Sequence, residues 1–322
     1  MPRESTSTHN NLYTIGFYNL ENLFDTENDP HTNDDDFTSE GELNWHSGRY
    51  ERKLYKLGKV ISTIGYAASK KAPVLMGLAE VENAAVVTDL LGSQHLSNKG
   101  FAQLHYDSPD KRGIDTALIY QERFFEPLLS SVEPVLIFEE SGERDFTRDI
   151  LHVEGKLNGE HMHILVNHWP SRREGDSETR YKRIEAAKTV HKVVNKIKAN
   201  EEDPAIIIMG DFNDDPFSVS IKEYLMTPDL YNPMETLLHP FQQGSLNHKQ
   251  QWNLFDQIIF SNNFFDFKHG THAFANADIF DEEFITNFHG HLKGTPFRTY
   301  AGRKYLGGFS DHFPVYVQLK KH

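Results

Sequence analysis

The sequence Ala-Ile-Ile-Ile-Met-Gly-Asp-Phe-Asn-Asp-Asp-Pro occupies residues Ala205–Pro216 and predicts a buried strand followed by a polar loop. Its run of apolar, mostly β-branched residues is typical of a strand inside a sheet that is covered on both faces. The strand is expected to stop at the glycine and to leave acids and an amide at its carboxyl end: Asp211, Asn213, Asp214 and Asp215. Asp211 and Asn213 are two positions apart, so in an extended segment their side chains point the same way.

Two interpretations of these polar residues stay open from this stretch alone. A carboxylate and a carboxamide that converge on one spot suit a hard cation, or a phosphate group and its attacking water. Asp, Asn and Pro are equally the usual residues of turns, and Asp215-Pro216 is a typical helix start.

The composition allows a large folded domain and restricts its partners. The chain has 322 residues, of which 38% are hydrophobic and 12% aromatic, enough for a packed core and too many for wholesale disorder. Its net charge of −14 argues against a protein that coats polyanions with a broad basic face. A phosphate substrate stays compatible with this charge, because a bound metal ion brings its own positive charge to an acidic site. The absence of cysteine excludes disulfides, thiolate metal sites and a cysteine nucleophile.

The N-terminal segment 1–11 is polar, and we expect it to be flexible and to contain no secretory signal. No run approaches the roughly 18 apolar residues that a membrane-spanning helix needs. We therefore expect a soluble protein without a transmembrane segment. Its compartment stays open between the cytoplasm and secretion with a signal already removed.

Strand-like and helix-like segments mix along the whole chain, without an internal repeat and without a Pro/Ser-rich linker. The patterns predict strands at 12–18, 73–79, 116–120, 132–138, 151–157, 162–167, 205–209, 255–261 and 313–319. They predict helices at 49–70, 84–91 (capped by Asn83), 178–199 (capped by Ser177) and 218–226. The segment 264–305 shows no clear period. Because strands often follow one another directly, the mixture favours one layered α+β domain over residues 12–320.

A recurring feature is an apolar strand that ends in acids, amides or histidines, with few lysines among them. The residues concerned are Asn19, Glu80, His168, Asp211, Asn213, Asp256, Asp311 and His312. Each could be ordinary loop chemistry, but their repetition at strand ends indicates a common site. Oxygen ligands with few histidines favour Mg²⁺, Mn²⁺ or Ca²⁺ over Zn²⁺.

Five motifs stand in a fixed order along the chain and cover about residues 12–319. They are Phe-Tyr-Asn-Leu-Glu-Asn at 17–22, Leu-Ala-Glu-Val-Glu at 78–82, Asn-His-Trp-Pro at 167–170, Gly-Asp-Phe-Asn at 210–213 and Ser-Asp-His-Phe-Pro-Val at 310–315. This set resembles the endonuclease/exonuclease/phosphatase superfamily, whose fold is deoxyribonuclease I-like. The resemblance implies a four-layered α/β/β/α sandwich, with two mixed sheets packed face to face and helices outside.

The resemblance also implies roles for the motif residues. Glu80 matches the glutamate that holds the divalent metal, and Asn19 matches the asparagine beside it. Asp211 and Asn213 match the pair that orients the attacking water and binds the scissile phosphate. His312 resembles the imidazole that contacts the phosphate and serves in acid–base chemistry.

The same resemblance implies roles for Asp311, His168 and Asp256, and Asp115 is a further supporting residue. Asp311 is expected to be the acidic partner of the last histidine or a metal ligand. His168 resembles the second histidine of the deoxyribonuclease and phosphatase branches, and Asp256 resembles an aspartate that often supports that histidine. Asp115 is expected to support the site from behind its direct ligands.

Two candidate substrate contacts have alternatives that the sequence leaves open. Arg172 belongs to a local cationic cluster that could meet substrate phosphates or pair with acids on a helix face. Trp169 could stack on a base or sugar, or pack in the core.

The sequence therefore predicts a hydrolase of phosphoester bonds that uses Mg²⁺ or Mn²⁺, with Ca²⁺ as a further candidate. A nuclease or related phosphodiesterase is the first expectation. The alternatives are a phosphatase or phospholipase-type diesterase that acts on inositol phosphates or sphingomyelin, and a non-catalytic binding module. For the lipid enzyme, the Phe-rich stretch 264–288 is a candidate lipid-facing hairpin, although core packing is the preferred use of these residues. The expected partner is a phosphoester substrate, with nucleic acid among the candidates and no obligate protein partner.

Overall fold

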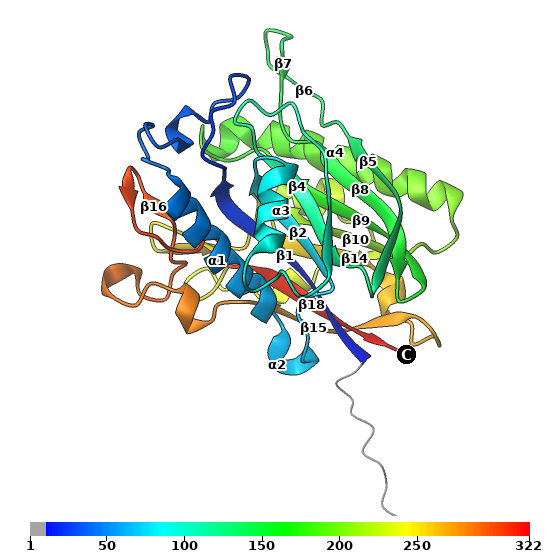
Figure 1. Cartoon of the computed structure of the whole chain (residues 1–322). Coiled ribbons are helices and arrows are strands. Elements are labelled where there is room, and N and C mark those ends of the chain that lie inside the picture. The colour runs from blue at the N-terminus through cyan, green and yellow to red at the C-terminus, as the bar shows by residue number, and fades with distance from the viewer. Residues whose placement is uncertain (1–10) are drawn as a thin grey trace, which may run out of the picture.

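The computed structural model describes residues 11–322, so residues 1–10 of the predicted flexible segment lie outside the described part. Within that part, two six-stranded mixed sheets pack face to face, and helices cover their outer sides (Figure 1). The predicted four-layered α/β/β/α sandwich is thus confirmed.

The first sheet has the strand order β15-β18-β1-β2-β4-β3, and β1 with β2 is its parallel pair. Its strands in chain order are β1 (Leu12–Leu23), β2 (Leu75–Val81), β3 (Phe101–His105), β4 (Asp115–Gln121), β15 (His272–Ile279) and β18 (Val315–Lys321).

The second sheet has the order β11-β14-β10-β9-β8-β5, and β9 with β10 is its parallel pair. Its strands in chain order are β5 (Phe125–Glu133), β8 (Ile150–Leu157), β9 (Glu160–His168), β10 (Ile206–Asp211), β11 (Leu230–Tyr231) and β14 (Asp256–Ser261). The strand predicted at 205–209 is β10, which lies inside this sheet and is buried along its length.

The main apolar core lies between the two sheets. Phe17 and Leu78 of the first sheet and Met209 and Ile258 of the second are fully buried in one cluster. Gly77 lets the sheets approach closely, since a Cβ atom there would lie 2.6 Å from the sulfur of Met209. This close packing fixes the ends of the two sheets relative to each other.

The helices are α1 (Ser47–Thr63), α2 (Tyr66–Ser69), α3 (Ala84–Gly92) and α4 (Asp176–Asn200). The carboxamide oxygen of Asn83 accepts hydrogen bonds from the backbone N–H groups of Ala85 and Val86, as predicted for the cap of α3. The helix predicted at 49–70 is divided, because Gly65 adopts a left-handed φ of 65° between α1 and α2. The long helix α4 begins at Asp176 after Gly175 and not at the predicted cap, Ser177.

Two other sequence predictions need correction. The segment 264–305 contains a regular strand, β15, whose alternation is broken by a register shift between Phe274 and Asn276. The predicted pairing of 132–138 with 151–157 holds only as far as Glu133, after which the chain leaves the sheet.

The remaining elements are short. Three hairpins pair β6 (Ile137–Phe138) with β7 (Arg144–Asp145), β12 (Leu246–His248) with β13 (Gln251–Asn253), and β16 (Tyr300–Ala301) with β17 (Lys304–Tyr305). The helix predicted at 218–226 is a single π-helical segment, η3 (Ser220–Leu225). Among residues 11–322, no helix combines the length and apolarity that a membrane span requires.

Candidate active site

The polar residues predicted at strand ends gather at one end of the sandwich, where the two sheets meet. Asp211, at the end of β10, lies opposite His168 of parallel β9 and opposite Asp256 of antiparallel β14. From the first sheet, Asn19 donates a hydrogen bond from Nδ2 to Asp211 Oδ2 over 3.0 Å. The sheet register therefore brings together residues far apart in sequence.

The ring nitrogens of two histidines face carboxylate oxygens at this end of the molecule. His168 Nε2 lies 3.9 Å from Glu80 Oε1 and 3.7 Å from Asp211 Oδ2. His312 Nε2 lies 4.0 Å from the same Asp211 oxygen and 4.0 Å from Asp311 Oδ1. These separations are too long for direct hydrogen bonds, and a water molecule or a phosphate oxygen can bridge them.

An irregularity in β2 sets the direction of the Glu80 side chain. The pairing of β2 with β4 shifts register between Ala79 and Val81, and Glu80 between them has a φ of 60°. Its Oε2 accepts a hydrogen bond from the backbone N–H of Asn22, which itself has a φ of 54°. Such left-handed backbone is costly for residues other than glycine and is often found at functional sites.

His312 is held in its charged form by the acids around it. Burial opposes the imidazolium, but the carboxylates of Asp256, Asp211 and Asp311 outweigh burial and raise the pKa of His312 well above its usual value. Its Nδ1 lies 2.7 Å from Asp256 Oδ2. His312 Nε2 can therefore donate a hydrogen bond toward Asp211 and the open site.

His168 has the opposite electrostatic environment. Burial, together with the positive charges of Arg148, Arg112 and His312, lowers the pKa of His168 well below its usual value and keeps it neutral. Burial raises the pKa of Asp211 to about 6, although the nearby His312 opposes this shift. Two histidines whose pKa values are pushed apart, with a carboxylate between them, are a typical arrangement for acid–base chemistry.

Asp256 supports a different histidine from the one expected. Its carboxylate pairs with His312, whereas the Nδ1 atom of His168 is buried without a hydrogen-bond partner. Asp311, expected as a partner of His312, instead receives a hydrogen bond of 2.7 Å from Arg298. The tertiary structure sets this pairing. The loop before β18 places His312 beside Asp256, the first residue of β14.

Asn19 and Asn213 are both fixed by hydrogen bonds. The Oδ1 of Asn19 accepts from the backbone N–H of Glu21 over 2.9 Å, while its Nδ2 is directed at Asp211. Asn213 has a φ of 49°, donates from Nδ2 to the carbonyl of Trp169, and sends its backbone N–H to Asp211 Oδ1. Asp211 is thus oriented by hydrogen bonds from two residues, Asn19 and Asn213.

The side chain of Trp169 is buried and is not available for contact with a substrate. Its side chain is 1% exposed, packs edge-to-face against Phe212, and donates from Nε1 to Asn167 Oδ1. The expectation that it stacks on a base or sugar is therefore wrong, and the alternative of core packing holds.

Arg172 is also committed to the protein. It donates from Nε to the Asn213 carbonyl over 2.7 Å and from Nη2 to Asp214 Oδ1 over 2.5 Å, and its guanidinium lies over the ring of Phe255. These donors are directed at the loop that carries Asn213, and Nε also lies 3.2 Å from Asp176 Oδ1 of α4, which supports the alternative of pairing with helix acids. We correct its role from substrate contact to support of that loop.

Asp115 is the first residue of β4 and lies opposite Val81 of β2. Its carboxylate accepts from the backbone N–H of Ser108 and lies 3.1 Å from His105 Nε2. The loop before β4 carries Arg112, which sequence reasoning did not place in the site. Arg112 Nη2 lies 3.8 Å from Glu80 Oε1 and donates to Asn22 Oδ1. The only sequence signal for it was the basic pair 111–112 ahead of a glycine turn.

Arg183 of α4 is part of a buried network of ion pairs. Arg183 is fully buried and forms ion pairs with Asp214 Oδ2 at 2.9 Å and Asp176 Oδ1 at 2.6 Å. Asp214 also accepts hydrogen bonds from Arg172 and Ser220. This network anchors the loop 211–215 to α4.

The Asp214→Asn variant is expected to lower the free energy of unfolding by about 3 kcal/mol, because it removes the fully buried one of the two carboxylates that pair with the Arg183 charge. Urea denaturation with an unchanged m-value measures this loss. The matched control is Arg180→Gln, which removes a half-exposed pair with Asp176 and should change stability by no more than about 0.5 kcal/mol. Equal effects of the two changes would show that the network does not anchor the loop.

The donor set around Glu80 fits a hard divalent cation. Glu80 Oε1 lies 3.8 Å from Arg112 Nη2 and 3.9 Å from His168 Nε2, beyond hydrogen-bond distance, and Asp211 lies 3.7 Å from the same His168 nitrogen. Burial raises the pKa values of Glu21 and Asp211, and the nearby carboxylates of Asp311 and Asp256, respectively, add to these shifts. A cation bound nearby would favour the charged forms of these carboxylates. Carboxylate and amide oxygens are the ligands that Mg²⁺ and Mn²⁺ prefer.

A sequence profile of the Endonuclease/Exonuclease/phosphatase family matches residues 14–321. The chain therefore belongs to this family, and it is an enzyme of the phosphoesterase type. Enzymes of this family depend on a divalent metal. No curated protein sequence matches the chain.

Solved structures share the fold at low sequence identity. An endonuclease/exonuclease/phosphatase family protein from Bacteroides thetaiotaomicron is 16% identical with a TM-score of 0.60, covering 97% of this chain and 95% of its own. A mannosyl-6-phosphatase from the same species is 16% identical with a TM-score of 0.59, covering 95% and 99%. D. rerio TDP2, solved with a single-strand DNA product, is 14% identical with a TM-score of 0.56, covering 96% and 99%.

Proposed function

We propose that this enzyme hydrolyses phosphodiester bonds by attack of an activated water on phosphorus, assisted by Mg²⁺ or Mn²⁺. The observation that carries the proposal is the convergence of His168 Nε2 and His312 Nε2 on one Asp211 oxygen, at 3.7 and 4.0 Å. Phosphoryl transfer requires a positioned water and stabilised charge on the phosphoryl oxygens, and this arrangement provides groups for both.

Each side chain has a role that follows from its charge. A divalent ion held by Glu80, with Asn19 and Asp311 as further oxygen ligands, would neutralise negative charge on the phosphoryl group when bound. Asp211, with a pKa of about 6, accepts the proton of the attacking water. The His312 imidazolium donates from Nε2 to a phosphoryl oxygen, and Asn213 fixes the position of Asp211.

Two cavities beside the site favour a diester over a simple monoester. A cavity of about 300 Å³ is lined by basic residues, among them Lys111, Arg112 and Arg173, and by the acids Asp110, Asp145 and Glu174. A smaller one, of about 170 Å³, is lined by Glu21, Asn22 and Arg298 together with the largely buried Trp45 and Tyr300. Arg112 links the first cavity to Glu80, so a flanking phosphate has a cationic place beside the reacting one.

The lipid alternative has little support in the fold. Of the Phe-rich stretch proposed as a hairpin, Phe264 and Phe280 are buried in the core, and Phe274 packs against Phe260. The exposed rings of this stretch are Phe265, Phe267 and Phe288, and Phe265 also packs against Tyr231 and Phe274. The middle of the stretch is strand β15, which pairs with β18 in the first sheet and is not a free hairpin.

The direct test is a substrate panel with Mg²⁺ or Mn²⁺, with and without EDTA. The panel contains bis-(p-nitrophenyl) phosphate, p-nitrophenyl phosphate, single-stranded DNA, RNA and a sugar phosphate. We expect diesters to be cleaved fastest and EDTA to abolish cleavage. Preferential cleavage of the monoesters would identify a phosphatase instead. Folded protein that cleaves no member of the panel would overturn the proposal and favour a binding module.

A further inference from the structure

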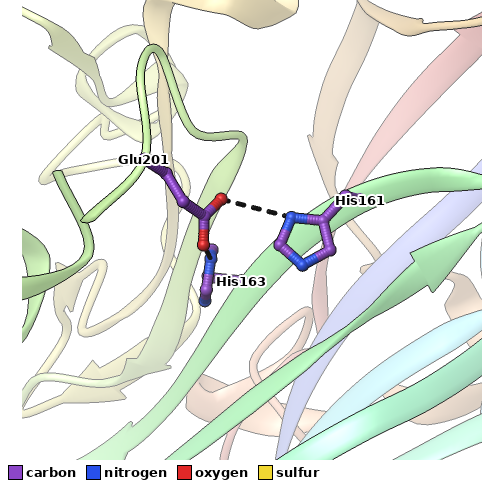
Figure 2. Close-up of side chains that lie close together, drawn as sticks. All are labelled: His161, His163 and Glu201. Carbon is purple, nitrogen blue, oxygen red and sulfur yellow. Dashed lines mark hydrogen bonds and ion pairs between the residues drawn. The ribbon is translucent and has the colours of Figure 1, made fainter.

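A second cluster of histidines and carboxylates lies at the opposite end of β9 from the candidate active site. His161 and His163 are two positions apart near the start of β9, so their side chains lie on the same face of the sheet. Glu201, the residue that ends α4, reaches this face from the helix layer. Figure 2 shows both imidazole rings directed at the Glu201 carboxylate.

The three side chains present ligand atoms at distances that suit one small cation. His163 Nε2 lies 2.8 Å from Glu201 Oε1, and His161 Nδ1 lies 3.2 Å from Glu201 Oε2. One ligand atom from each of the three residues falls within 4.8 Å of the others. A tetrahedral Zn²⁺ ion with bonds of about 2.0–2.1 Å has ligand atoms about 3.4 Å apart, so small movements suffice to complete its coordination.

The other ring nitrogen of each imidazole also has a partner. His161 Nε2 lies 2.9 Å from Glu154 Oε1, and His163 Nδ1 lies 3.0 Å from His152 Nε2. Histidines that bind metals commonly donate their second ring N–H to a carboxylate or another acceptor, which fixes the tautomer and the ring orientation. Both rings therefore have the outer partners that a metal site needs.

The surroundings favour a cation at this position. Glu201 lies at the C-terminus of the 25-residue helix α4, where the helix dipole is negative. A cavity of about 250 Å³ beside it is lined by Glu160, Glu202 and Asp203. Lys268 lines the same cavity, but its ammonium group is paired with Asp266 at 2.8 Å.

We propose that His161, His163 and Glu201 form a binding site for a borderline transition metal, Zn²⁺ in the first place, separate from the catalytic metal. Imidazole ligands select Zn²⁺ over Mg²⁺, in contrast with the oxygen ligands around Glu80. The cavity beside His161 and Glu201 leaves room for a water molecule as a further ligand. The ion fastens the end of α4 to the start of β9, so its role is structural and independent of the proposed phosphodiester chemistry.

Co²⁺ and Zn²⁺ binding to the full chain, with Mg²⁺ in excess to occupy the oxygen site, tests this proposal. We expect one Zn²⁺ per chain, the intense visible absorption of tetrahedral Co²⁺, and a Tm raised by about 3–6 °C at a hundredfold excess of Zn²⁺ over Kd. His161→Gln and Glu201→Gln should remove all three effects. Both side chains are about one-third exposed, so these variants keep the fold better than changes at the buried His163.

Glu202→Gln is the matched control, because Glu202 lines the same cavity and belongs to no part of the ligand set. It should retain the Co²⁺ spectrum and the shift in Tm. The proposal is overturned if wild-type protein shows no tetrahedral Co²⁺ spectrum. It is also overturned if His161→Gln and Glu201→Gln bind Zn²⁺ as strongly as Glu202→Gln does.

Discussion

Replacing His312 with glutamine is expected to lower kcat/KM for phosphoester hydrolysis by about 10²–10⁴-fold. Glutamine preserves much of the size of the side chain but cannot carry the positive charge that Asp256, Asp211 and Asp311 stabilise on the imidazole. The variant therefore loses the donor that faces Asp211 Oδ2 across 4.0 Å. Because this contact is to be completed by a phosphoryl oxygen in the transition state, the loss should appear mainly in kcat.

The structure supplies a matched control for this change in His272. That histidine is as deeply buried and has its Nδ1 2.5 Å from Glu160 Oε2, much as His312 has Asp256. It lies opposite Lys321, at the far end of β18 from the site. His272→Gln should lose comparable stability and retain kcat. If the two variants lose activity equally, His312 acts only through the stability of the fold.

Replacing Glu80 with glutamine is expected to lower kcat/KM about 10³-fold and to raise the Mg²⁺ concentration needed for half-maximal rate. A metal ion that neutralises phosphoryl charge is worth several kcal/mol in the transition state, and about 1.4 kcal/mol corresponds to a tenfold change in rate. Glutamine retains an oxygen that can accept the Asn22 N–H, so the bulged end of β2 should stay intact. The loss then reports the carboxylate charge and not the local fold.

Glu82→Gln provides the comparison, two residues further along the chain. The Glu82 carboxylate accepts the backbone N–H of Asp25 over 2.6 Å, and burial raises its pKa to about 7. A glutamine oxygen can accept the same bond, so this variant should keep the wild-type rate and Mg²⁺ dependence. Rates measured over a Mg²⁺ titration distinguish the Glu80→Gln variant from the Glu82→Gln variant. A Glu80→Gln enzyme with wild-type Mg²⁺ dependence would place the metal elsewhere.

Local sequence signals predicted the elements well where burial and capping agree. The apolar run 206–209 is the buried strand β10, and Asn83 caps α3 through its side-chain oxygen. The order of the motifs was enough to predict the sandwich. Prediction failed at β15, because the register shift at Phe274 and Asn276 interrupts the alternation on which strand prediction depends.

Side-chain exposure, like the register shift in β15, could not be predicted from the sequence. Trp169 and Arg172 follow the strand that ends in His168, as substrate-contacting residues often do, but Phe212 and Asp214 from a distant loop cover or pair with them. Arg112 and Arg298 belong to no periodic pattern, yet one approaches Glu80 and the other binds Asp311. These contacts depend on loops whose paths are set by packing and not by local preference.

The sequence alone determined which residue types stand at the ends of the strands: Asn19, Glu80, His168, Asp211 and His312. It could do so because strand ends and polar residues are local features, readable from a few neighbouring positions. Only the tertiary structure decided that Asp256 pairs with His312 and helps to keep it charged, and that burial and the nearby positive charges keep His168 neutral. The physical reason is that a pKa depends on burial and on charges within a few ångströms, and the packing of two sheets sets both.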